Sequence, residues 1–378
     1  MKVALCTGWN IERDGIADYA RYFLEGLRQA GVAVTVIPLG HYIDDREFYR
    51  NAAEEANKAD LIHIQFNYLY FNGQMPYRNR YAYFRSLLRK PVVMTCHEIR
   101  PALEPVSGRF SIRGAGYNAT LWLWNALSRR LHTKMYASSN ALIVHSGVQK
   151  TMLLPYVSNR ENIVVIPHGI PAIDTARQKL SMEEAKKKVG FSGKTVLMVY
   201  GFINKKKGYA CILDALLNLG PEYALLIAGG KMQDNAVDTS YEAHVRSMIA
   251  HKGLTERVHI TGYLTAAQAG DIFSAADICL APFSGNSASG ALSVCIGYHK
   301  PIIASDIELH REICARIPCL ELFPAGESGT LAQSIASLSQ DGQKRNRLQE
   351  LCRRYGQEYS YAAIALKTAE VYKSFFRG

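Results

Sequence analysis

The stretch Asn286-Ser-Ala-Ser-Gly-Ala-Leu-Ser-Val-Cys-Ile-Gly-Tyr-His-Lys-Pro-Ile-Ile-Ala-Ser-Asp306 decides the fold class of this chain. An apolar segment typical of a buried strand, Ile278-Cys-Leu-Ala-Pro282, precedes it, and a second one, Pro301-Ile-Ile-Ala304, lies within it. Between the two, a turn of small residues leads into an apolar, helix-like run. The first N–H groups of a helix are unpaired and carry the positive end of its dipole, so such a turn favours a diphosphate. An ordinary strand–turn–helix of an α/β sheet has the same pattern, so the stretch alone leaves both interpretations open.

Short apolar segments alternate with longer helical patterns along the whole chain, which is typical of parallel βαβ units. In the first half, the predicted strands are Val3–Cys6, Val32–Ile37, Leu61–Ile64, Val92–Thr95, Ala141–His145 and Ile163–Ile166. In the second half, they are Thr195–Tyr200, Tyr223–Ala228, Val258–Thr261, Ile278–Ala281 and Pro301–Ala304. The predicted helices between strands include Ile16–Ala30, Gly208–Leu219, Tyr241–Lys252, Ala266–Ala275 and Gly290–Tyr298. We therefore expect an α/β protein with two consecutive, doubly wound Rossmann-like sheets.

The boundary between the two domains is expected in the polar stretch Ala172–Gly193. This places an N-terminal domain at residues 1–178 and a C-terminal domain at residues 179–358. Two such sheets facing one another would leave a cleft along the carboxyl ends of their strands, where ligands of open α/β sheets bind. The chemistry should then lie on the loops that follow the strands.

The composition is that of a folded protein, with 48% hydrophobic and 20% charged residues among 378. No apolar run approaches the ~20 residues that cross a bilayer. The first residues, Met1-Lys-Val-Ala-Leu-Cys6, read as a strand rather than a leader, so we expect a cytoplasmic protein. The eight cysteines are scattered without a Cys-x-x-Cys pair, which favours reduced core thiols over disulfides or a metal site.

The net charge of +11 is concentrated in residues 78–134, which hold eleven Lys and Arg residues against two Glu. Aromatic residues are interleaved with these cations, among them Trp122 and Trp124. A basic, aromatic surface suits an anionic partner, so the segment predicts peripheral contact with the inner face of a membrane or with a lipid diphosphate. A solvated surface with some buried rings is the alternative. No nucleic-acid motif is present, so nucleic acid is not expected as a partner.

Eight short motifs, correctly ordered around the predicted strands, resemble the retaining glycosyltransferases of family 4. They are Asp14-Gly-Ile-Ala-Asp-Tyr19, Thr95-Cys-His-Glu98, Ile143-Val-His-Ser146, Ile166-Pro-His-Gly-Ile170, Tyr200-Gly-Phe-Ile through Lys207-Gly208, Ile227-Ala-Gly-Gly230, Thr261-Gly-Tyr-Leu264 and Ala276-Asp-Ile through Pro282. The opening stretch resembles the nucleotide-sugar loop of the same family. The resemblance spans nearly the whole chain and implies the GT-B fold, with the acceptor on the first domain, the nucleotide sugar mainly on the second, and a C-terminal helix at 359–378 crossing back to the first.

The resemblance also implies a donor site without a metal. Lys207, directly before Gly208, would hold the donor diphosphate, where a cation offsets the charge that develops as the sugar–oxygen bond breaks. A lysine of the solvated run 205–207 is the alternative interpretation. The other residues expected at the donor are Gly15, Gly201, Phe202, Gly230, Ser289, Gly290, Ala291 and Leu292.

A histidine after the fourth strand touches the transferred sugar near its 6-position in matching family members. The resemblance therefore implies that His97 lies at the reacting centre, with Glu98 orienting it. Asp18 and His145 are expected at the acceptor, although Asp18 is equally a first-turn helix residue. His168 is interpreted as a turn residue near an interdomain hinge.

Two departures from the family pattern bear on the donor. Many members carry two Glu residues around the diphosphate loop, and the corresponding positions here are Asn286 and Val294. Many also carry an Arg where this chain has Phe202. A different ribose contact, weaker ribose binding or loss of activity would each follow from these changes.

The sequence therefore predicts a retaining, metal-independent glycosyltransferase. It would move a hexose from a nucleoside-diphosphate sugar to a saccharide or lipid-linked saccharide acceptor, in bacterial polysaccharide or glycan biosynthesis. A nucleotide-sugar-binding protein without transfer activity and a nucleotide-sugar epimerase on the same fold are the alternatives. A nicotinamide dehydrogenase is not expected, because no Gly-x-Gly-x-x-Gly follows the first strand.

Overall fold

A computed structural model describes residues 1–72, 79–99, 112–173, 180–231, 236–285 and 289–376. The chain divides into two compact units. Unit 1 comprises Met1–Pro167 together with Ala362–Gly378, and unit 2 comprises His168–Tyr361. The units divide at Pro167 and His168, ahead of the expected boundary at 178, because the backbone around Ile170 pairs with Ser360 and Tyr359 of unit 2.

Unit 1 is a parallel six-stranded sheet with the order β2-β1-β3-β4-β5-β6. Its strands are β1 (Lys2–Gly8), β2 (Ala33–Leu39), β3 (Leu61–Phe66), β4 (Val92–Cys96), β5 (Ala141–Val144) and β6 (Ile163–Val165). Its helices are α1 (Gly15–Gln29), α2 (Arg46–Ala56), α3 (Tyr81–Leu87), α4 (Ile112–Ala137), α5 (Gly147–Leu153) and α14 (Tyr361–Ser374). The central strands are buried on both faces and read as continuous apolar runs, as parallel sheets require.

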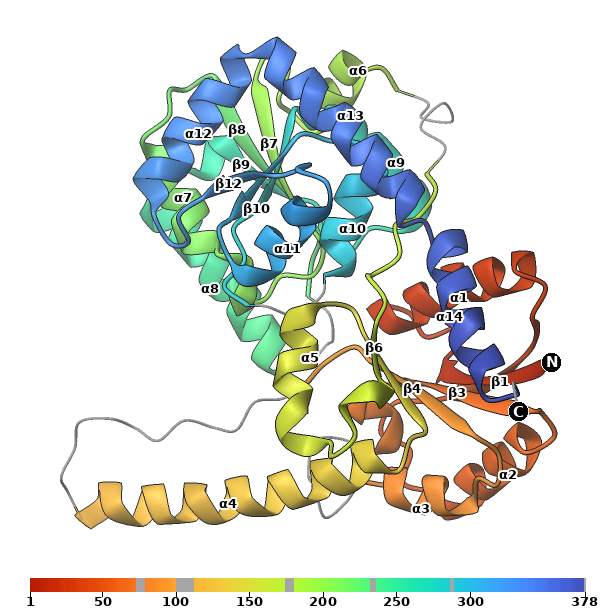
Figure 1. Ribbon diagram of the computed structural model, residues 1–378. Helices are drawn as coiled ribbons and strands as arrows, with labels where there is room; N and C mark the ends of the chain where they lie inside the picture. The colour runs from red at the N-terminus through yellow and green to blue at the C-terminus, as the bar shows by residue number, and fades with distance from the viewer. Residues whose placement is uncertain (73–78, 100–111, 174–179, 232–235, 286–288, 377–378) are drawn as a thin grey trace. The chain divides into compact units, whose positions relative to one another are not determined.

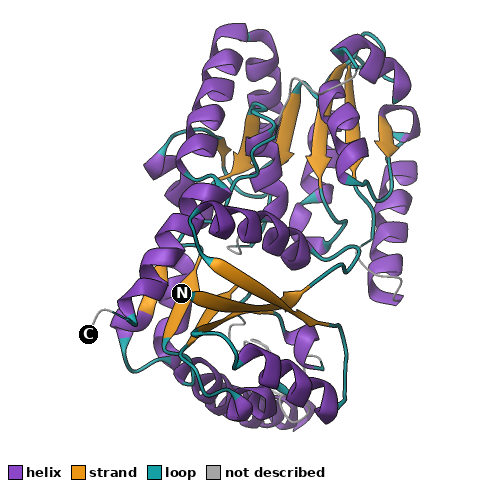
Figure 2. Ribbon diagram, turned by 90° about the vertical axis from the view of Figure 1, so that its right-hand side faces the viewer, coloured by secondary structure: helices purple, strands orange, loops and turns teal. Residues whose placement is uncertain are grey.

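Unit 2 is a second parallel six-stranded sheet, with the order β12-β11-β10-β7-β8-β9. Its strands are β7 (Thr195–Tyr200), β8 (Tyr223–Ala228), β9 (Val258–Ile260), β10 (Ile278–Ala281), β11 (Ile302–Ser305) and β12 (Glu321–Phe323). Its helices are α6 (Met182–Lys188), α7 (Tyr209–Leu217), α8 (Ala236–His251), α9 (Ala266–Ala275), α10 (Gly290–Gly297), α11 (Glu308–Arg316), α12 (Ser328–Gln340) and α13 (Gly342–Glu358). Helices cover both faces of each sheet (Figure 2), so the prediction of two doubly wound sheets is confirmed.

The C-terminal helix α14 packs within unit 1, as expected. Figure 1 shows this helix, drawn in blue, among the red elements β1 and α1. Its buried Tyr372 hydroxyl is hydrogen-bonded to His63 Nδ1 on β3. The chain therefore begins and ends in the same unit, although unit 2 lies between the two segments in the sequence.

The eight cysteines are all free thiols, and six of them are buried, as expected for core residues. Within the described ranges, no helix combines the length and apolar character that a bilayer crossing requires.

Candidate functional site

The order of strands in unit 2 reverses direction at β7, which pairs with β10 on one side and β8 on the other. In open α/β sheets, the loops after the two strands at such a reversal emerge side by side and form the ligand site. Here these loops are the segment from Gly201 to Gly208, after β7, and the segment between β10 and Ser289, the N-cap of α10. The two features that the sequence linked to a diphosphate, Lys207 and the start of α10, are therefore carried by neighbouring loops.

Gly201 lies directly between these two features. A Cβ at this position would be 2.8 Å from Ala291 Cβ and 3.4 Å from Lys207 Nζ. Its φ of +100° also lies in the region that side chains other than glycine rarely adopt. The ammonium group of Lys207 and the first turn of α10 thus both lie close to the backbone of Gly201.

Lys207 is only 7% exposed, although its neighbours Lys205 and Lys206 are exposed. The lysine is turned inward because the short 3₁₀ turn Lys205–Lys207 ends at Gly208 in the left-handed conformation. Its Nζ donates to the carbonyl of Tyr200 at 3.0 Å and lies 4.3 Å from the centre of the Phe283 ring. Burial lowers the pKa of Lys207 to about 8, and among the described residues no carboxylate offsets this.

The first turn of α10 is capped at only one of the N–H groups of Gly290, Ala291 and Leu292. The Ser289 hydroxyl accepts from the N–H of Leu292 at 3.3 Å, so this N–H is paired. The side chain of Leu292 is buried in the core. Within the described ranges, no acceptor is paired with the N–H of Gly290 or Ala291. These two N–H groups and the dipole of the helix together favour an anion at this point.

His168 lies beside this same helix turn, which the sequence did not predict. Its Nδ1 is 2.9 Å from the carbonyl oxygen of Gly169 and 3.0 Å from the Ser293 hydroxyl, and its Nε2 would be 3.9 Å from a Cβ at Gly290. Burial lowers the pKa of His168 to about 4, although the Gly169 contact opposes this, so the ring is neutral at pH 7. The interpretation of His168 as a hinge turn residue thus missed its contact with α10, which is remote in sequence.

The other expected donor residues line the adjacent strand ends of unit 2. The Phe202 ring lies parallel to that of Tyr263, with centroids 6.3 Å apart and an interplanar angle of 10°. A Cβ at Gly230 would be 2.9 Å from the Tyr263 backbone nitrogen, so the loops after β8 and β9 touch. Val294 is partly buried and packs against the core of unit 2, while Asn286 lies outside the described residues.

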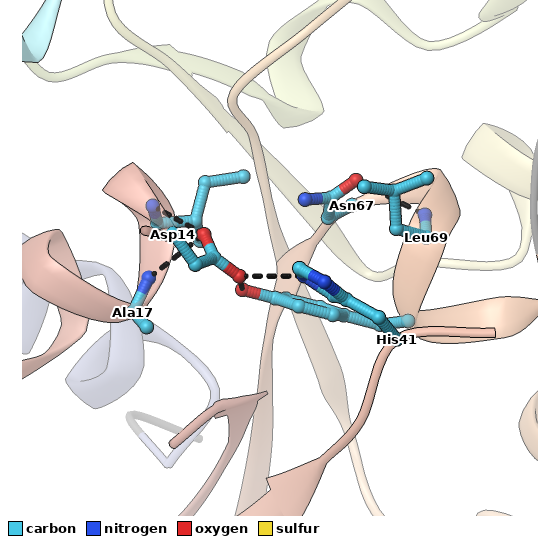
Figure 3. A network of polar contacts seen from close by, with 7 residues as sticks. Asp14, Ala17, His41, Asn67 and Leu69 are labelled. Carbon is cyan, nitrogen blue, oxygen red and sulfur yellow. Dashed lines mark hydrogen bonds and ion pairs between the residues drawn. The ribbon is translucent and has the colours of Figure 1, made fainter. Parts of the chain in front are cut away.

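In unit 1, a carboxylate holds the loop after β1. The side chain of Asp14 caps α1 by accepting from the N–H groups of Ile16 and Ala17, and it also contacts His41 Nε2 at 2.8 Å, as Figure 3 shows. Burial alone would raise the pKa of Asp14, but these contacts and the hydroxyl of Tyr70 at 2.6 Å lower it overall.

The two loop residues predicted to meet ligands lie just beyond this cap. A Cβ at Gly15 would meet nothing within 4 Å, so no contact with the neighbouring described residues requires glycine at this position. The Asp18 carboxylate, 48% exposed, forms an ion pair with Arg21 one turn along α1. Acceptor contact through Asp18 stays a prediction.

A chain of polar side chains crosses the carboxyl ends of β3, β4 and β5 in unit 1. His97 Nε2 lies 2.6 Å from Gln65 Oε1, and His97 Nδ1 lies 3.2 Å from His145 Nε2. Gln149, on α5, donates to the carbonyl of His97 and accepts from the backbone of His145. Gln65 and His145 thus contact the His97 ring directly, while Glu98 is exposed, and its expected role in orienting His97 stays a prediction.

His145 is 3% exposed, and both of its ring nitrogens contact groups within unit 1. This geometry disfavours direct contact with an acceptor, which stays a prediction for this residue. The sequence analysis did not predict that Gln65 contacts His97. The signal for a role of Gln65 is that it is a polar residue near the end of an apolar strand. Within the described parts of the chain, no three His, Cys, Asp or Glu side chains gather as a metal-binding group. Metal independence also stays a prediction.

Two family models match successive segments of the chain. The model described as Glycosyltransferase Family 4 matches residues 38–172, and the model described as Glycosyl transferases group 1 matches residues 181–355. The first match falls within unit 1 apart from its last residues, and the second falls within unit 2. Together they cover β3 to β6 of unit 1 and all six strands of unit 2, whereas β1, α1 and most of β2 precede the first match.

Three known proteins illustrate the similarity. A phosphatidyl-myo-inositol mannosyltransferase from Mycobacterium leprae is 26% identical over 56% of this chain and 53% of its own length. A mannosylfructose-phosphate synthase from Agrobacterium fabrum is 29% identical over 38% of this chain and 33% of its own length. The chain thus spans about half of the first relative and a third of the second.

The structure of Anabaena HepE, in complex with UDP and glucose, aligns over 99% of this chain and 100% of its own with a TM-score of 0.69 and 18% identity. At this identity the likeness establishes the fold, which is therefore GT-B, as the sequence predicted. The paired family models and the shared fold place this chain in glycosyltransferase family 4.

Proposed function

We propose that the protein is a retaining glycosyltransferase that moves a hexose from a nucleoside-diphosphate sugar to a saccharide or lipid-linked saccharide acceptor. The observation that carries the proposal is the buried ammonium group of Lys207, which has no carboxylate partner among the described residues and faces the first turn of α10. A buried cation without a counter-ion is costly, so a ligand with complementary charge is the simplest reason for its presence. A diphosphate is such a ligand.

In this proposal, Lys207 and the N–H groups of Gly290 and Ala291 bind the diphosphate and stabilise it as it leaves. The bond between the sugar's anomeric carbon and the diphosphate oxygen breaks, and the acceptor oxygen bonds to that carbon on the same face. The proton of the acceptor hydroxyl passes to the departing diphosphate oxygen. Hydrogen-bond donors that are fixed in place before the reaction stabilise a developing negative charge far more strongly in a site that excludes water than in water itself. The reaction would therefore proceed without a metal.

The nucleobase would lie at the strand ends beside this site. Phe202 and Tyr263 offer two parallel aromatic faces there, and Gly230 brings the neighbouring loop close to Tyr263. Val294 places an apolar side chain where many family members bind the ribose with a carboxylate, so the ribose must be held by other groups. UDP is the first nucleotide to test, since HepE is in complex with it. Gly15 and Gly201 would allow the donor to approach the backbone closely.

His97 would contact the transferred sugar and orient it. Its ring is held by Gln65 and His145 and is therefore fixed before the substrate binds, which is what a positioning contact requires. Asp18 would reach an acceptor hydroxyl by exchanging its exposed ion pair with Arg21, which contributes little to stability.

The second half of α4 supports a lipid-linked acceptor at the inner face of a membrane. Trp122, Leu123 and Leu127 are 68%, 62% and 46% exposed, and Arg130 and Lys134 follow at helical spacing on the face of Leu123 and Leu127. Figure 1 shows α4 as a long helix that extends beyond the rest of unit 1. Residues 120–137 contain no acidic residue, so this helix combines apolar contact area with attraction to anionic lipids. Two other parts of the basic segment 78–134, residue 78 and residues 100–111, lie outside the described residues.

The proposal is tested in two steps. UDP-, GDP- and ADP-sugars are compared for their effect on the melting temperature, because a ligand at a hundred times its dissociation constant adds about 2.7 kcal/mol of stability. The stabilising donor, labelled in its sugar, is then incubated with the protein and a bacterial lipid extract. We expect label to appear in a lipid-linked saccharide. No stabilisation by any of these donors, together with no transfer, would contradict the proposal.

Val294 and Phe202 support a second candidate, a nucleotide-sugar-binding protein without transfer activity, because they replace the Glu and Arg that many family members use. Donor binding with intact donor after long incubation would favour this candidate. Conversion of the donor sugar into its epimer without any acceptor would favour an epimerase.

A further inference from the structure

The loops that follow the first three strands of unit 1 are joined at the carboxylate of Asp14. Asp14 follows β1, His41 follows β2 and Tyr70 follows β3. The carboxylate lies 2.8 Å from His41 Nε2 and 2.6 Å from the Tyr70 hydroxyl, and Figure 3 shows the contact with His41. The strand order of this sheet reverses at β1, which pairs with β2 on one side and β3 on the other. Ligands of open α/β sheets bind at the carboxyl ends of strands beside such a reversal.

The contact with Asp14 determines which nitrogen of the His41 ring carries a proton. Burial alone would raise the pKa of the Asp14 carboxyl, but its contacts with His41, Tyr70 and two backbone N–H groups lower the pKa overall. An ionised carboxylate can only accept, so His41 Nε2 carries a proton and donates it to Asp14. The ring is therefore held in one orientation, and Nδ1 is the nitrogen that remains.

The Nδ1 atom of His41 is accessible to a ligand. It has no hydrogen-bond partner among the residues that the structure describes, and it is not one of the described polar atoms that are buried without a partner. The nitrogen is therefore open to solvent, in a side chain that is 19% exposed. A hydroxyl group suits this nitrogen in either protonation state, because a hydroxyl donates to a bare nitrogen and accepts from a protonated one.

An exposed aromatic ring lies next to the His41 ring. Tyr42 is 56% exposed, and its ring centroid is 6.3 Å from that of His41 at an interplanar angle of 75°. The backbone φ of Tyr42 is +57°, a conformation that is unfavourable for a bulky side chain. Its N–H donates to the carbonyl of Leu69 at 2.8 Å, so the segment after β3 holds the residue in this conformation. Backbone strain in a residue whose ring adds little to the core is typical of a ligand site.

We propose that Tyr42 and His41 form a saccharide-binding site, in which a sugar packs its C–H face on the Tyr42 ring and directs a hydroxyl to His41 Nδ1. A sugar offers both an apolar face and hydroxyl groups, and binding sites for small molecules pair aromatic surface with a few fixed polar groups in this way. The saccharide would be the acceptor, and only this role rests on the proposed function. Asp14, which fixes the His41 ring, directly precedes Gly15 in the loop after β1.

The substitution Tyr42→Gly removes the aromatic face without weakening the fold. Glycine adopts a positive φ without strain, so the melting temperature should stay the same or rise. His299 of unit 2 has a φ of +53°, so His299→Gly makes the same backbone change outside the proposed site and serves as the matched control. A residue with a purely structural role would not combine undiminished stability with a loss of ligand.

The substitution His41→Gln separates the two nitrogens of the ring. The amide nitrogen of Gln corresponds to Nε2 and still donates to Asp14, whereas no atom of Gln corresponds to Nδ1. The cap of α1 should therefore be kept while the contact with the sugar hydroxyl is lost. His259→Gln changes an exposed histidine of unit 2 and is the matched control.

The first measurement uses the full-length protein with ¹⁵N-labelled histidines. It is titrated with the methyl glycosides of glucose, galactose, mannose and N-acetylglucosamine, and separately with inorganic phosphate. We expect His41 Nε2 to be protonated, and at least one glycoside to shift the Nδ1 resonance of His41 but not the resonances of His259. Tyr42→Gly should weaken binding of that glycoside about tenfold, and His299→Gly should leave it unchanged. No shift with any glycoside, or a shift with phosphate alone, would overturn the proposal.

The second measurement is the transfer of labelled sugar to the bacterial lipid extract at increasing extract concentration. We expect the concentration for half-maximal rate to rise about tenfold in Tyr42→Gly and about fivefold in His41→Gln, with the affinity for UDP unchanged. His299→Gly and His259→Gln should match the wild type. Half-maximal concentrations equal to that of the wild type in both Tyr42→Gly and His41→Gln would overturn the proposal. If the wild type transfers no sugar, the proposed function fails, while the glycoside titration still decides this inference.

Discussion

The proposed diphosphate region of unit 2 and the histidine region of unit 1 are both polar and largely buried, but they are built in opposite ways. In unit 2, the Lys207 ammonium and the first N–H groups of α10 face one point, and no described residue offers them an anion. In unit 1, the His97 ring contacts Gln65 and the His145 ring, the His145 ring contacts the Ile166 carbonyl, and Gln149 contacts the backbone of both histidines. The first region is built to receive a charge, and the second is built to hold a side chain in place.

A second buried lysine in unit 2 shows that this difference is not a general property of lysines in this fold. Lys186 is as buried as Lys207, but its Nζ lies 2.9 Å from Asp277 Oδ2. A structural lysine in this sheet thus carries its own counter-ion. The absence of a carboxylate partner for Lys207 among the described residues is the observation that supports its proposed role in binding the diphosphate.

The largest expected effect is that of Lys207→Ala on nucleotide binding. Removing one partner of a buried, hydrogen-bonded charge pair typically costs about 2–5 kcal/mol, so the affinity for UDP should fall about thirtyfold or more. The measurement is isothermal titration of UDP, with Lys205→Ala as the matched control because Lys205 is the exposed lysine two positions earlier. Equal losses in the two variants would mean that the cation acts only as diffuse surface charge.

The next effect is expected at the glycine that separates the two halves of the diphosphate site. An alanine at 201 would place its Cβ 2.8 Å from Ala291 Cβ in a backbone conformation that disfavours side chains. We expect Gly201→Ala to weaken UDP binding about tenfold and to destabilise the protein by roughly 1–3 kcal/mol.

The control for this variant is Gly329→Ala, in the first turn of α12, where a Cβ would meet nothing within 4 Å. Its stability should be unchanged or slightly raised, since alanine suits a helix better than glycine. UDP binding at wild-type strength by Gly201→Ala would show that the start of α10 and Lys207 do not act together.

Gly15 offers the corresponding test in unit 1, where the expected effect is smaller. Apart from its chain neighbours and the backbone of its own helix, no described atom lies within 4 Å of a Cβ at this position, so Gly15→Ala should not lower the stability. If a ligand approaches the backbone there, the added methyl should reduce the transfer rate roughly five- to tenfold. A rate equal to that of the wild type would mean that this loop does not approach the substrate.

A separate prediction concerns stability alone: substitutions of the two buried lysines should change the free energy of unfolding in opposite directions. The folded-state pKa of Lys207, about 8, is below the ordinary lysine value of about 10.4, so the unfolded chain binds the proton more tightly between these values. Stability therefore rises with pH through this window, and at pH 7 the folded protein carries the full cost of the buried charge. Lys207→Met should remove that cost and raise the free energy of unfolding at pH 7 by about 1–2 kcal/mol.

Lys186→Met should act in the opposite direction, because it leaves the Asp277 carboxylate without its cation. We expect a loss of roughly 1–3 kcal/mol, measured by urea unfolding at pH 7 for both variants. Destabilisation by Lys207→Met comparable to that by Lys186→Met would show that Lys207 has a structural partner after all.

The sequence predicted the fold well where apolar runs are buried on both sides. β7, β8 and β10 begin and end where the sequence placed them, because a central parallel strand is apolar throughout and its ends are marked by the first polar or glycine residue. The edge strand β12 was not predicted, since three residues beginning with a glutamate carry no such signal. Helix α4 was not predicted as one helix either, because its apolar residues do not keep to one face.

The candidate site was predicted in part, and the division follows from how local each feature is. Lys207 and the start of α10 depend on short motifs directly after a strand, so the sequence could identify both and place them together at the reversal of the sheet. The contacts of His97 with Gln65 and His145 depend on the relative positions of three strands. The contact of His168 with α10 joins segments that are remote in sequence. Neither could be read from the order of residues alone.

The most direct test of the account is the number of protons taken up when UDP binds. At a pH of about 8.5, most of the Lys207 side chains in the free protein should be neutral, and a bound diphosphate should restore the charge. Calorimetry in buffers of different ionisation enthalpy should then show well over half a proton taken up per UDP by the wild type, and close to none by Lys207→Met. The same uptake in both proteins would contradict the claim that this ammonium group binds the diphosphate.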